Sequence, residues 1–419
     1  MSQFSITVEG LPTKLLLVLG IVVVSFLSLF AAKWNLANAV STRADSKDLV
    51  DLAASLAPDD PQTRYAAGAI YDKTFESADA GRSLAEFEAA AANTPNNYLA
   101  WLAVSKARGR SGDTEGEVTA AKRALDLAPN YASVQWAYGN VLFRNGDERA
   151  MEHIRRAAES DKQYRVPAVD LMMLQYDSRL NEVRKALGET PAILAAICQN
   201  LVRNQKYAEA EKLWLDIDPE ERHHSLTEQA LAMASIAMNA KQFRFARILY
   251  VDGGRISGSV GAIHDGGFEN GVKVRGADAF EWQIADGAEP QIAISNSIKK
   301  GGSNSLLLQF NTMEAAAFRQ VSQVIAVEPG SSYTFAASYR TELKASSTLK
   351  FVITDTTTGA EIASTQPFDA MADWSTVSAR FVVPATTDGI TVSLARADCR
   401  STICPINGKV WLDDISLTR

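Results

Sequence analysis

The chain has 419 residues, a hydrophobic fraction of 47% and a net charge of −7 at pH 7. Its length exceeds what one hydrophobic core usually organises, so we expect two or three domains. The mildly acidic balance excludes the basic surface of a nucleic-acid-binding protein, and the four histidines have no Cys, Asp or Glu at zinc-like spacing, which argues against a catalytic metal.

The first predicted element is an apolar helix near the N-terminus. Residues 15–32 contain no charged side chain, and at 1.5 Å per residue they make roughly 27 Å of helix, close to the ~30 Å thickness of a hydrocarbon layer. Lys14 and Lys33 bracket this run, and Trp34 follows at the position of an interfacial aromatic ring. We therefore interpret residues 15–34 as a transmembrane signal anchor.

Two further questions concern this anchor. The alternative to an anchor is a cleaved signal peptide, with Ala37-Asn38-Ala39 as its small-residue site, although the apolar run exceeds the usual h-region of about 7–15 residues. We expect residues 1–14 to form a short cytoplasmic tail. The rest of the chain would then be periplasmic or otherwise extracytoplasmic on a bacterial cytoplasmic (inner) membrane, with a single pass. Lys and Arg are too few on either side for the positive-inside rule to decide.

Residues 47–250 are rich in Ala and Leu and repeat internally. Pro95 and Pro129 are 34 residues apart, and the pairs Gly112-Asp113 and Gly146-Asp147 repeat at the same interval. Two weaker units follow, in which residues 207–210 and 243–246 match at a spacing of 36. This pattern resembles the tetratricopeptide repeat, in which helical hairpins stack into a solenoid because none can bury its apolar stripe alone.

The resemblance implies a concave groove that binds a protein partner. Several aromatic and Met side chains could line such a groove, and the alternative, which is the commoner role at these spacings, is packing between hairpins. The candidates are Trp101, Trp136, Tyr138, Met172, Met173 and Trp214.

A Gly-rich stretch, residues 251–265, separates the helical array from a different pattern. We expect it to be a linker or a first edge segment. From residue 266 to 419 short alternating runs are separated by turn residues, which predicts an all-β jelly-roll sandwich. The expected strands are 305–310, 317–327, 332–341, 348–355, 374–383, 391–396 and 409–417. The fold class is thus multidomain: one transmembrane helix, an all-α solenoid and an all-β sandwich.

The ends of the sandwich segment carry specific motifs. It opens with Gly267-Phe268-Glu269-Asn270-Gly271, contains Val327-Glu328-Pro329-Gly330, and closes with Trp411-Leu412-Asp413-Asp414. In this order the motifs resemble carbohydrate-binding modules of the family 4/9 type. The resemblance covers about a third of the chain and concerns the scaffold more than the ligand. It implies a polysaccharide ligand for the sandwich.

The resemblance also implies a structural calcium ion. The matching acids are Glu269 on the first strand and Asp413 or Asp414 on the last, and calcium prefers such oxygen ligands. The alternative is that these acids cap turns at the edge of the sandwich.

Sugar binding needs aromatic faces and planar hydrogen-bonding groups on the outside of the sandwich. Alternation along the strands places Phe318, Gln320, Arg340 and Lys350 on outward faces, and Trp282 is a candidate platform on a loop. Each has ordinary surface or edge packing as its alternative.

The cysteines give evidence on whether the sandwich lies in an oxidising or a reducing cellular compartment. Cys399 and Cys404 are separated by four residues, a spacing that a local disulfide can span, and a disulfide needs an oxidising compartment. Two reduced cysteines in a cytosolic loop are the alternative. Cys198 lies among apolar helical residues and reads as a buried thiol.

These features predict a non-enzymatic, membrane-anchored adaptor in bacterial exopolysaccharide or cell-envelope polysaccharide assembly. Its solenoid would bind a protein and its sandwich a glycan. The alternative is a purely protein-interaction scaffold with the sandwich as a spacer or protein-binding domain. An enzyme is disfavoured because the sequence has no Gly-x-Ser-x-Gly elbow and no phosphate-binding loop.

Overall fold

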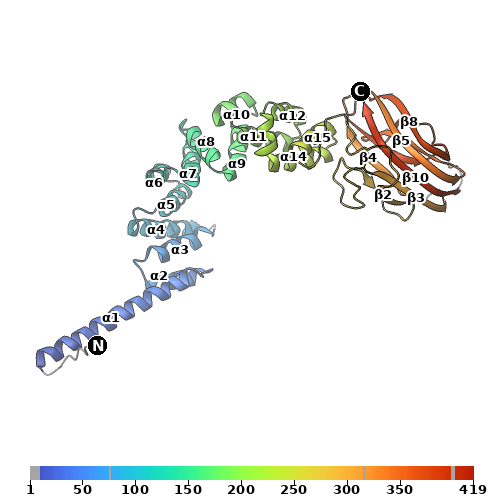
Figure 1. Cartoon of the computed structure of the whole chain (residues 1–419). Coiled ribbons are helices and arrows are strands. Elements are labelled where there is room, and N and C mark those ends of the chain that lie inside the picture. Colours follow the sequence, from blue (N-terminus) through green and yellow to red (C-terminus); the bar gives the residue numbers. More distant parts are fainter. Residues whose placement is uncertain (1–9, 75–76, 315–317, 398–401) are drawn as a thin grey trace, which may run out of the picture. The chain divides into compact units, whose positions relative to one another are not determined.

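The computed structural model describes residues 10–74, 77–314, 318–397 and 402–419. In these residues an apolar helix is followed by a region of 14 α-helices and then by two antiparallel sheets (Figure 1). The multidomain fold expected from the sequence is confirmed. The chain divides into two compact units, the first ending at Gly188 and the second beginning at Glu189, so the boundary falls within the helical region.

The apolar helix α1 runs from Leu11 to Ser41, longer than the segment 15–34 that we interpreted as the anchor. It is the one helix among the described residues that is long and apolar enough to cross a membrane, and none of its most apolar 18 residues is buried. Its C-terminal end differs in character, because Ala37 and Ser41 are buried where α1 contacts α2 and α3.

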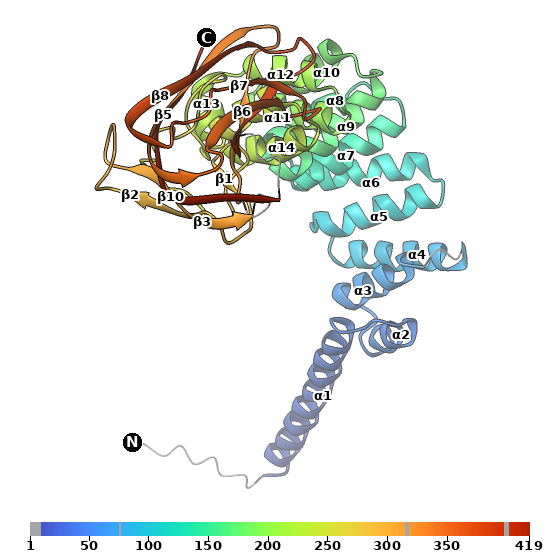
Figure 2. The ribbon, with the colours of Figure 1, turned by 90° about the vertical axis from the view of Figure 1, so that its right-hand side faces the viewer.

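The remaining helices of the first unit form consecutive hairpins, and Figure 2 shows α3 to α6 lying one above another in chain order. The strongest neighbour pairs are α3 with α4, α5 with α6 and α7 with α8, which are the three repeats read from the sequence. The helices are α2 (Lys47–Leu56), α3 (Pro61–Asp72), α4 (Ser77–Asn93), α5 (Tyr98–Arg110), α6 (Thr114–Leu127), α7 (Ala132–Arg144), α8 (Ala150–Ser160), the 3-10 turn η1 (Lys162–Tyr164), α9 (Arg165–Gln175) and α10 (Leu180–Leu187).

The repeated Gly-Asp pair explains how one hairpin turns. Gly112 has a φ of +79°, a left-handed conformation that glycine adopts without steric cost. Asp113 then caps α6, because its carboxylate accepts a hydrogen bond from the backbone N–H of Gly116 at 2.9 Å. Gly146 repeats the left-handed turn 34 residues later with a φ of +70°.

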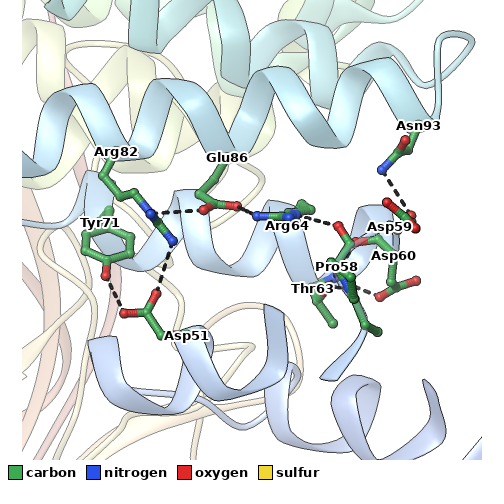
Figure 3. A network of polar contacts seen from close by, with 11 residues as sticks. Asp51, Pro58, Asp59, Asp60, Thr63, Arg64, Tyr71, Arg82, Glu86 and Asn93 are labelled. Atoms are coloured by element: carbon green, nitrogen blue, oxygen red, sulfur yellow. Dashed lines mark hydrogen bonds and ion pairs between the residues drawn. The ribbon is translucent and has the colours of Figure 1, made fainter. Parts of the chain in front are cut away.

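A polar network joins the first three helices after the anchor (Figure 3). Asp51 on α2 accepts a hydrogen bond from the hydroxyl of Tyr71 on α3 at 2.8 Å and lies 3.6 Å from Arg82 on α4. Glu86 on α4 pairs with both Arg82 and Arg64. The network connects α2 to the first repeat, so α2 belongs to the solenoid although it directly follows α1.

The second unit begins with five helices. They are α11 (Pro191–Arg203), α12 (Tyr207–Leu215), α13 (Pro219–His224), α14 (Thr227–Asn239) and α15 (Phe243–Asp252). The two weaker sequence units start α12 and α15, and their closing alanines, Ala210 and Ala246, are fully buried. The 36-residue match therefore marks equivalent helices, as the periodicity predicted.

Two five-stranded antiparallel sheets form the sandwich. Sheet A has the order β1 (Gln283–Ile284), β4 (Val321–Ala326), β9 (Gly389–Arg396), β6 (Leu349–Asp355) and β7 (Glu361–Ser364). Sheet B has the order β2 (Gln291–Ser295), β3 (Ser305–Glu314), β10 (Ile403–Thr418), β5 (Ser332–Ala345) and β8 (Met371–Val382). All seven predicted strands are present, although residue 317 at the start of one prediction lies outside the described residues. The strands β1, β2 and β7 were missed.

The core lies between the sheets and follows the alternation of the strands. Tyr333, Phe335 and Tyr339 on β5 are buried, and so are Leu349, Phe351 and Ile353 on β6. Because neighbouring residues of a strand point to opposite faces, the residues between them lie on the outer faces. The outer faces are where a ligand of the sandwich would bind.

The sandwich packs against the last helix of its own unit, with α15 next to β4 (Figure 1). Asp388, in the turn before β9, accepts hydrogen bonds from the backbone N–H groups of Phe243 and Arg244 at 3.2 and 2.9 Å. Arg244 also contacts Glu328 at 2.8 Å. The Gly-rich stretch that we expected to be a linker is itself held, because the N–H of Gly261 donates to the carbonyl of Ala326 on β4 at 2.7 Å.

Candidate functional site

The outer face of sheet A carries a row of five residues in register across its five strands, and four of them are polar. The row runs through Gln283, Ser322, Ser393, Val352 and Ser364. Four strand spacings of about 4.8 Å make this row roughly 19 Å wide. A parallel row of Val324, Thr391 and Thr354 adds further hydroxyl groups. Hydroxyl and amide groups on a broad face can hydrogen-bond the hydroxyls of an extended sugar chain.

A cavity of about 460 Å³ continues this face at its β1 edge. Gln283, Ser322 and Gln320 line it from the sheet, and Lys273 and Arg275 line it from the loop before β1. Lys273 is 2.8 Å from Glu281, and this hydrogen bond raises the pKa of Lys273, so the lysine stays cationic. The edge of the face therefore combines amide, hydroxyl and cationic groups.

Two of the predicted glycan-binding residues lie on this face. Gln320 is exposed immediately before β4 and lines the cavity. Lys350 lies on the outward side of β6, where its Nζ donates to the hydroxyl of Ser364 at 3.3 Å. Both residues are therefore positioned to contact the same extended ligand.

Arg340 lies elsewhere. It is on β5 of sheet B, between the buried Tyr339 and Thr341, and so on the outer face of the other sheet. Its guanidinium covers the ring of Trp411 at 5.8 Å and pairs with Asp373 at 2.6 Å. Because the outer faces of a sandwich point in opposite directions, Arg340 and Lys350 cannot bind one ligand together.

The two aromatic candidates are tied to the core. Trp282 is only 3% exposed, packs against Phe268, and donates its Nε1–H to the carbonyl of Asp265 at 3.2 Å. The prediction of an exposed loop platform at Trp282 is wrong, because the segment before β1 folds onto the core and the indole fills it. Phe318 is half-buried with its ring stacked on Phe310, so one face of it is already covered.

Sequence reasoning missed the serines of the central row. Ser322 and Ser393 are at outward positions of β4 and β9, although Ser393 is only 7% exposed and its hydroxyl donates to the carbonyl of Val352. The available signal was the alternation itself, which puts Ser322 on the outward side of residues 321–326, together with the apolar Val324. Small polar residues at such positions look like ordinary surface until the strands are aligned.

Of the three acids predicted to bind calcium, Glu269 and Asp413 have carboxylates that already accept hydrogen bonds from backbone N–H groups. Both oxygens of Glu269 accept hydrogen bonds from the backbone N–H of Ser303. Asp413, which is fully buried, accepts from the N–H groups of Lys300, Gly301 and Asp414 at 2.7, 3.0 and 2.7 Å. These bonds tie the loop before β3 to the first and last segments of the sandwich.

The hydrogen bonds of Glu269 and Asp413 compete with calcium binding. The oxygens of Glu269 and Asp413 face N–H donors, which a cation would have to displace, and the described residues contain no group of three or more His, Cys, Asp or Glu side chains placed to hold a metal. Burial raises the pKa of Asp414, and the charges of Asp413 and Glu269 raise it further. Calcium binding stays a prediction, and no step of the function below depends on it.

The solenoid has a cavity of about 610 Å³ lined by α5, α6 and α7. Its walls carry Leu102 and Lys106 from α5, and Trp136, Asn140 and Arg144 from α7. The ring of Trp136 is stacked on Tyr164 at 5.3 Å, which fixes its orientation. The cavity thus offers one aromatic wall and several cationic and amide groups to a bound chain segment.

The other aromatic and Met candidates of the solenoid pack between hairpins. Tyr138, Met172, Met173 and Trp214 are all buried, which confirms packing as their role. Trp101 is half-buried, and its indole N–H donates to the carbonyl of Pro95 at 3.0 Å.

The disulfide prediction involves one residue that the structure does not describe. Cys404 is buried at the start of β10, whereas Cys399 lies outside the described residues. Pairing of these cysteines therefore stays a prediction. Cys198 is fully buried in α11, and burial raises the pKa of its thiol, so it is an inert packing residue as expected.

Comparison with known proteins agrees with the C-terminal fold. Residues 260–397 match the family model of the carbohydrate binding domain of the 4/9 type, a match that covers less than half of the chain. The resemblance that we read from the sandwich motifs is confirmed for these residues. No curated protein matches the chain.

Solved structures are similar to parts of the chain. A family 16 carbohydrate binding module is 17% identical over 38% of this chain and 99% of its own, with a TM-score of 0.27. A family 4 module is 15% identical over 37% of this chain and 98% of its own, with a TM-score of 0.28. MamA of AMB-1 is 22% identical over 27% of this chain, with a TM-score of 0.25, and the chain spans 66% of it, slightly less than two thirds.

Proposed function

We propose that this protein is a membrane-anchored, non-catalytic adaptor that holds a glycan near a protein partner in bacterial exopolysaccharide or cell-envelope polysaccharide assembly. The observation that carries the proposal is the match of residues 260–397 to a carbohydrate binding domain. The row on sheet A supports it, because that row offers hydroxyl and amide groups on four of its five strands.

The three parts of the chain would act together. The apolar helix α1 would anchor the protein in the cytoplasmic membrane with the bulk of the chain outside the cytoplasm. A protein partner would occupy the cavity between α5, α6 and α7, where Trp136 offers an aromatic wall. A polysaccharide would lie across sheet A, with Gln320 and Lys350 donating hydrogen bonds to its hydroxyls. The adaptor would thereby keep a polymer near membrane-bound machinery.

The test is a calorimetric titration of the full-length protein in detergent against a panel of bacterial polysaccharides. We expect one polymer to bind saturably. Gln320→Ala and Lys350→Ala should each weaken binding by about fivefold, which corresponds to one hydrogen bond of about 1 kcal/mol. Arg340→Ala is the matched control, since Arg340 lies on the opposite sheet, and it should bind as the wild type does. Equal losses for all three variants would contradict a site on sheet A.

A purely protein-interaction scaffold is the second candidate. The observation in its favour is that the two aligned rows on sheet A contain no aromatic side chain to stack on a sugar ring. A folded protein that binds no polymer in the titration would support this candidate. Under it, Trp136→Ala should abolish capture of the solenoid's partner, while the lost stacking on Tyr164 should lower the unfolding temperature only slightly.

A further inference from the structure

The helix α2 carries apolar side chains over more of its surface than the protein covers. Val50, Ala53 and Ala54 are buried, whereas Leu49 and Leu52 are 39% and 49% exposed. At about 100° of rotation per residue, Leu49, Leu52 and Leu56 fall on one strip that adjoins the buried face. We call these three residues the leucine strip. A contiguous apolar strip beside a buried face is a surface on which a further apolar layer can pack.

The leucine strip faces away from the rest of the solenoid. Lys47 and Asp51 lie on the opposite side of α2, and both contact the helices that follow. Lys47 pairs with Asp79 on α4 at 2.5 Å, and Asp51 accepts a hydrogen bond from Tyr71 on α3 at 2.8 Å. Figure 3 shows Asp51 directed from α2 toward α3 and α4. The opposite side of α2, which holds the leucine strip, is therefore directed away from the stack of repeats.

The position of α2 along α1 places the strip near the level of Trp34. Ala37 and Ser41 are the buried residues of α1, and they lie about 4.5 and 10.5 Å beyond Trp34 at 1.5 Å per residue. Trp34 is on the same side of α1 as these two residues, one turn nearer to the apolar span. A helix has a radius of about 5 Å, so the near side of α2 comes within a few ångströms of the level of Trp34. An interfacial ring marks the headgroup layer, which is about 5–7 Å thick on each side of a bilayer.

We propose that the leucine strip of α2 rests in the lipid interface of the membrane that α1 spans. The inference rests on the membrane anchoring in the proposed function. The occupant is lipid because the strip is directed away from the repeats and lies near the level of Trp34, at the end of the apolar span. Lys33 and Arg43, both exposed, flank the region and can contact lipid phosphates. Asp51 and Lys47 connect α2 to α3 and α4. The position of α2 in the interface therefore sets the orientation of the first repeat relative to the bilayer.

The test uses the full-length protein in nanodiscs of phosphatidylethanolamine and phosphatidylglycerol. Leu52→Cys is labelled with an environment-sensitive fluorophore, and its quenching by nitroxide lipids and by aqueous iodide is measured. Leu99→Cys on α5 is the matched control, since Leu99 is also 49% exposed but belongs to the second repeat. Val23→Cys, in the apolar span, reports on anchoring itself. Protein without an introduced cysteine corrects for the native thiols.

We expect the label at residue 52 to be quenched by nitroxide lipids and protected from iodide severalfold relative to residue 99. A label at residue 52 as accessible to iodide as that at residue 99 would overturn the inference. Protection from iodide without quenching by lipid would also overturn it, because a protein would then cover the strip. If either of these two results is obtained while the label at Val23 is quenched by nitroxide lipids, the anchoring by α1 stands and only the proposed lipid contact of the leucine strip is wrong. If the label at Val23 is not lipid-quenched, the anchoring of the proposed function has failed.

Discussion

At the scale of single residues, one buried carboxylate connects several parts of the last helical hairpins. Asp252 is 3% exposed and accepts hydrogen bonds from the indole N–H of Trp214 at 2.6 Å and from Arg222 at 3.0 Å. Arg222 is itself only 9% exposed. A buried charge is tolerated only when it is paired and hydrogen-bonded, so each partner depends on the other.

Replacement of this carboxylate should therefore be costly. Asp252→Ala leaves the Arg222 guanidinium buried without its counter-charge, and we expect the free energy of unfolding to fall by about 3 kcal/mol or more. Urea denaturation of the full-length protein in detergent measures this. Asp252→Asn is the matched control, because it keeps an acceptor for Trp214, and it should cost less. An alanine variant as stable as the wild type would contradict this account.

Whereas Asp252 stabilises the folded state, the ionised carboxylate of Asp414 should destabilise it. Its pKa is raised, first by burial and then by the charges of Asp413 and Glu269, so the folded state binds its proton more tightly than the unfolded chain does. Stability from this group therefore falls as pH rises from the ordinary carboxyl value through the raised one. Asp414→Asn removes the charge and suits the φ of +47° at this position, since Asn tolerates the left-handed region.

We expect Asp414→Asn to unfold at a slightly higher temperature than the wild type at pH 7 in the presence of a chelator. The wild type should approach the variant as the pH is lowered. Thermal unfolding between the acid range and neutrality measures both effects. A wild-type unfolding temperature that rises with added calcium, while that of the variant does not, would show that a cation does bind at Asp414.

Single residues also show where sequence reasoning ends. The outward positions of Gln320 and Lys350 followed from strand alternation, because that period needs only local sequence. The burial of Trp282 did not follow, since it depends on a turn-rich segment that folds back onto Phe268 and Asp265. The separation of Arg340 from Lys350 required the order of strands in the two sheets, which alternation does not contain.

At the scale of elements, the cap of α15 is supplied from 145 residues away. Asp388 accepts hydrogen bonds from two N–H groups at the start of α15, and Gly389 packs so closely that a Cβ there would lie 2.1 Å from the ring of Phe243. A helix N-terminus has unpaired N–H groups that such a carboxylate satisfies. The helix and the sandwich therefore stabilise each other.

Asp388→Ala should lower the free energy of unfolding by about 1 kcal/mol, the usual cost of a lost cap. Hydrogen exchange of residues 243–252 should accelerate, because the cap and the contact with the sandwich weaken together. Asp113→Ala, which removes the local cap of α6, is the matched control. It should accelerate exchange in α6 and leave α15 unchanged. Unchanged exchange in α15 with Asp388→Ala would show that the cap carries no stability.

The elements that sequence predicted are those with a strong local period. The 34-residue repeat located the hairpins, and alternation located seven of the ten strands. The strands β1 and β7 have only two and four residues, too few for a period to show. The contacts between α15 and the sandwich could not be predicted either, because nothing in the sequence near Phe243 indicates that Asp388 caps this helix.

At the scale of the whole molecule, the way α1 ends bears on whether the apolar helix is cleaved from the chain. The apolar span and the small-residue site Ala37-Asn38-Ala39 belong to one continuous helix, Leu11–Ser41. Ala37 is fully buried where α1 meets α2 and α3. A peptidase cuts an extended, accessible segment, and this one is helical and packed against the first repeat. Cleavage would also remove the helix on which α2 packs.

We therefore expect the protein to keep its N-terminus in the membrane. Intact mass spectrometry of protein extracted from membranes should show the span still attached, and salt washing should not release the protein. A matched variant that unpacks the site, Ala37→Pro, breaks the helix there and should expose the small-residue site, giving a shorter product. A wild-type protein whose first residue is Val40 would show instead that the apolar helix is a cleaved signal peptide, and the adaptor would then need another means of attachment.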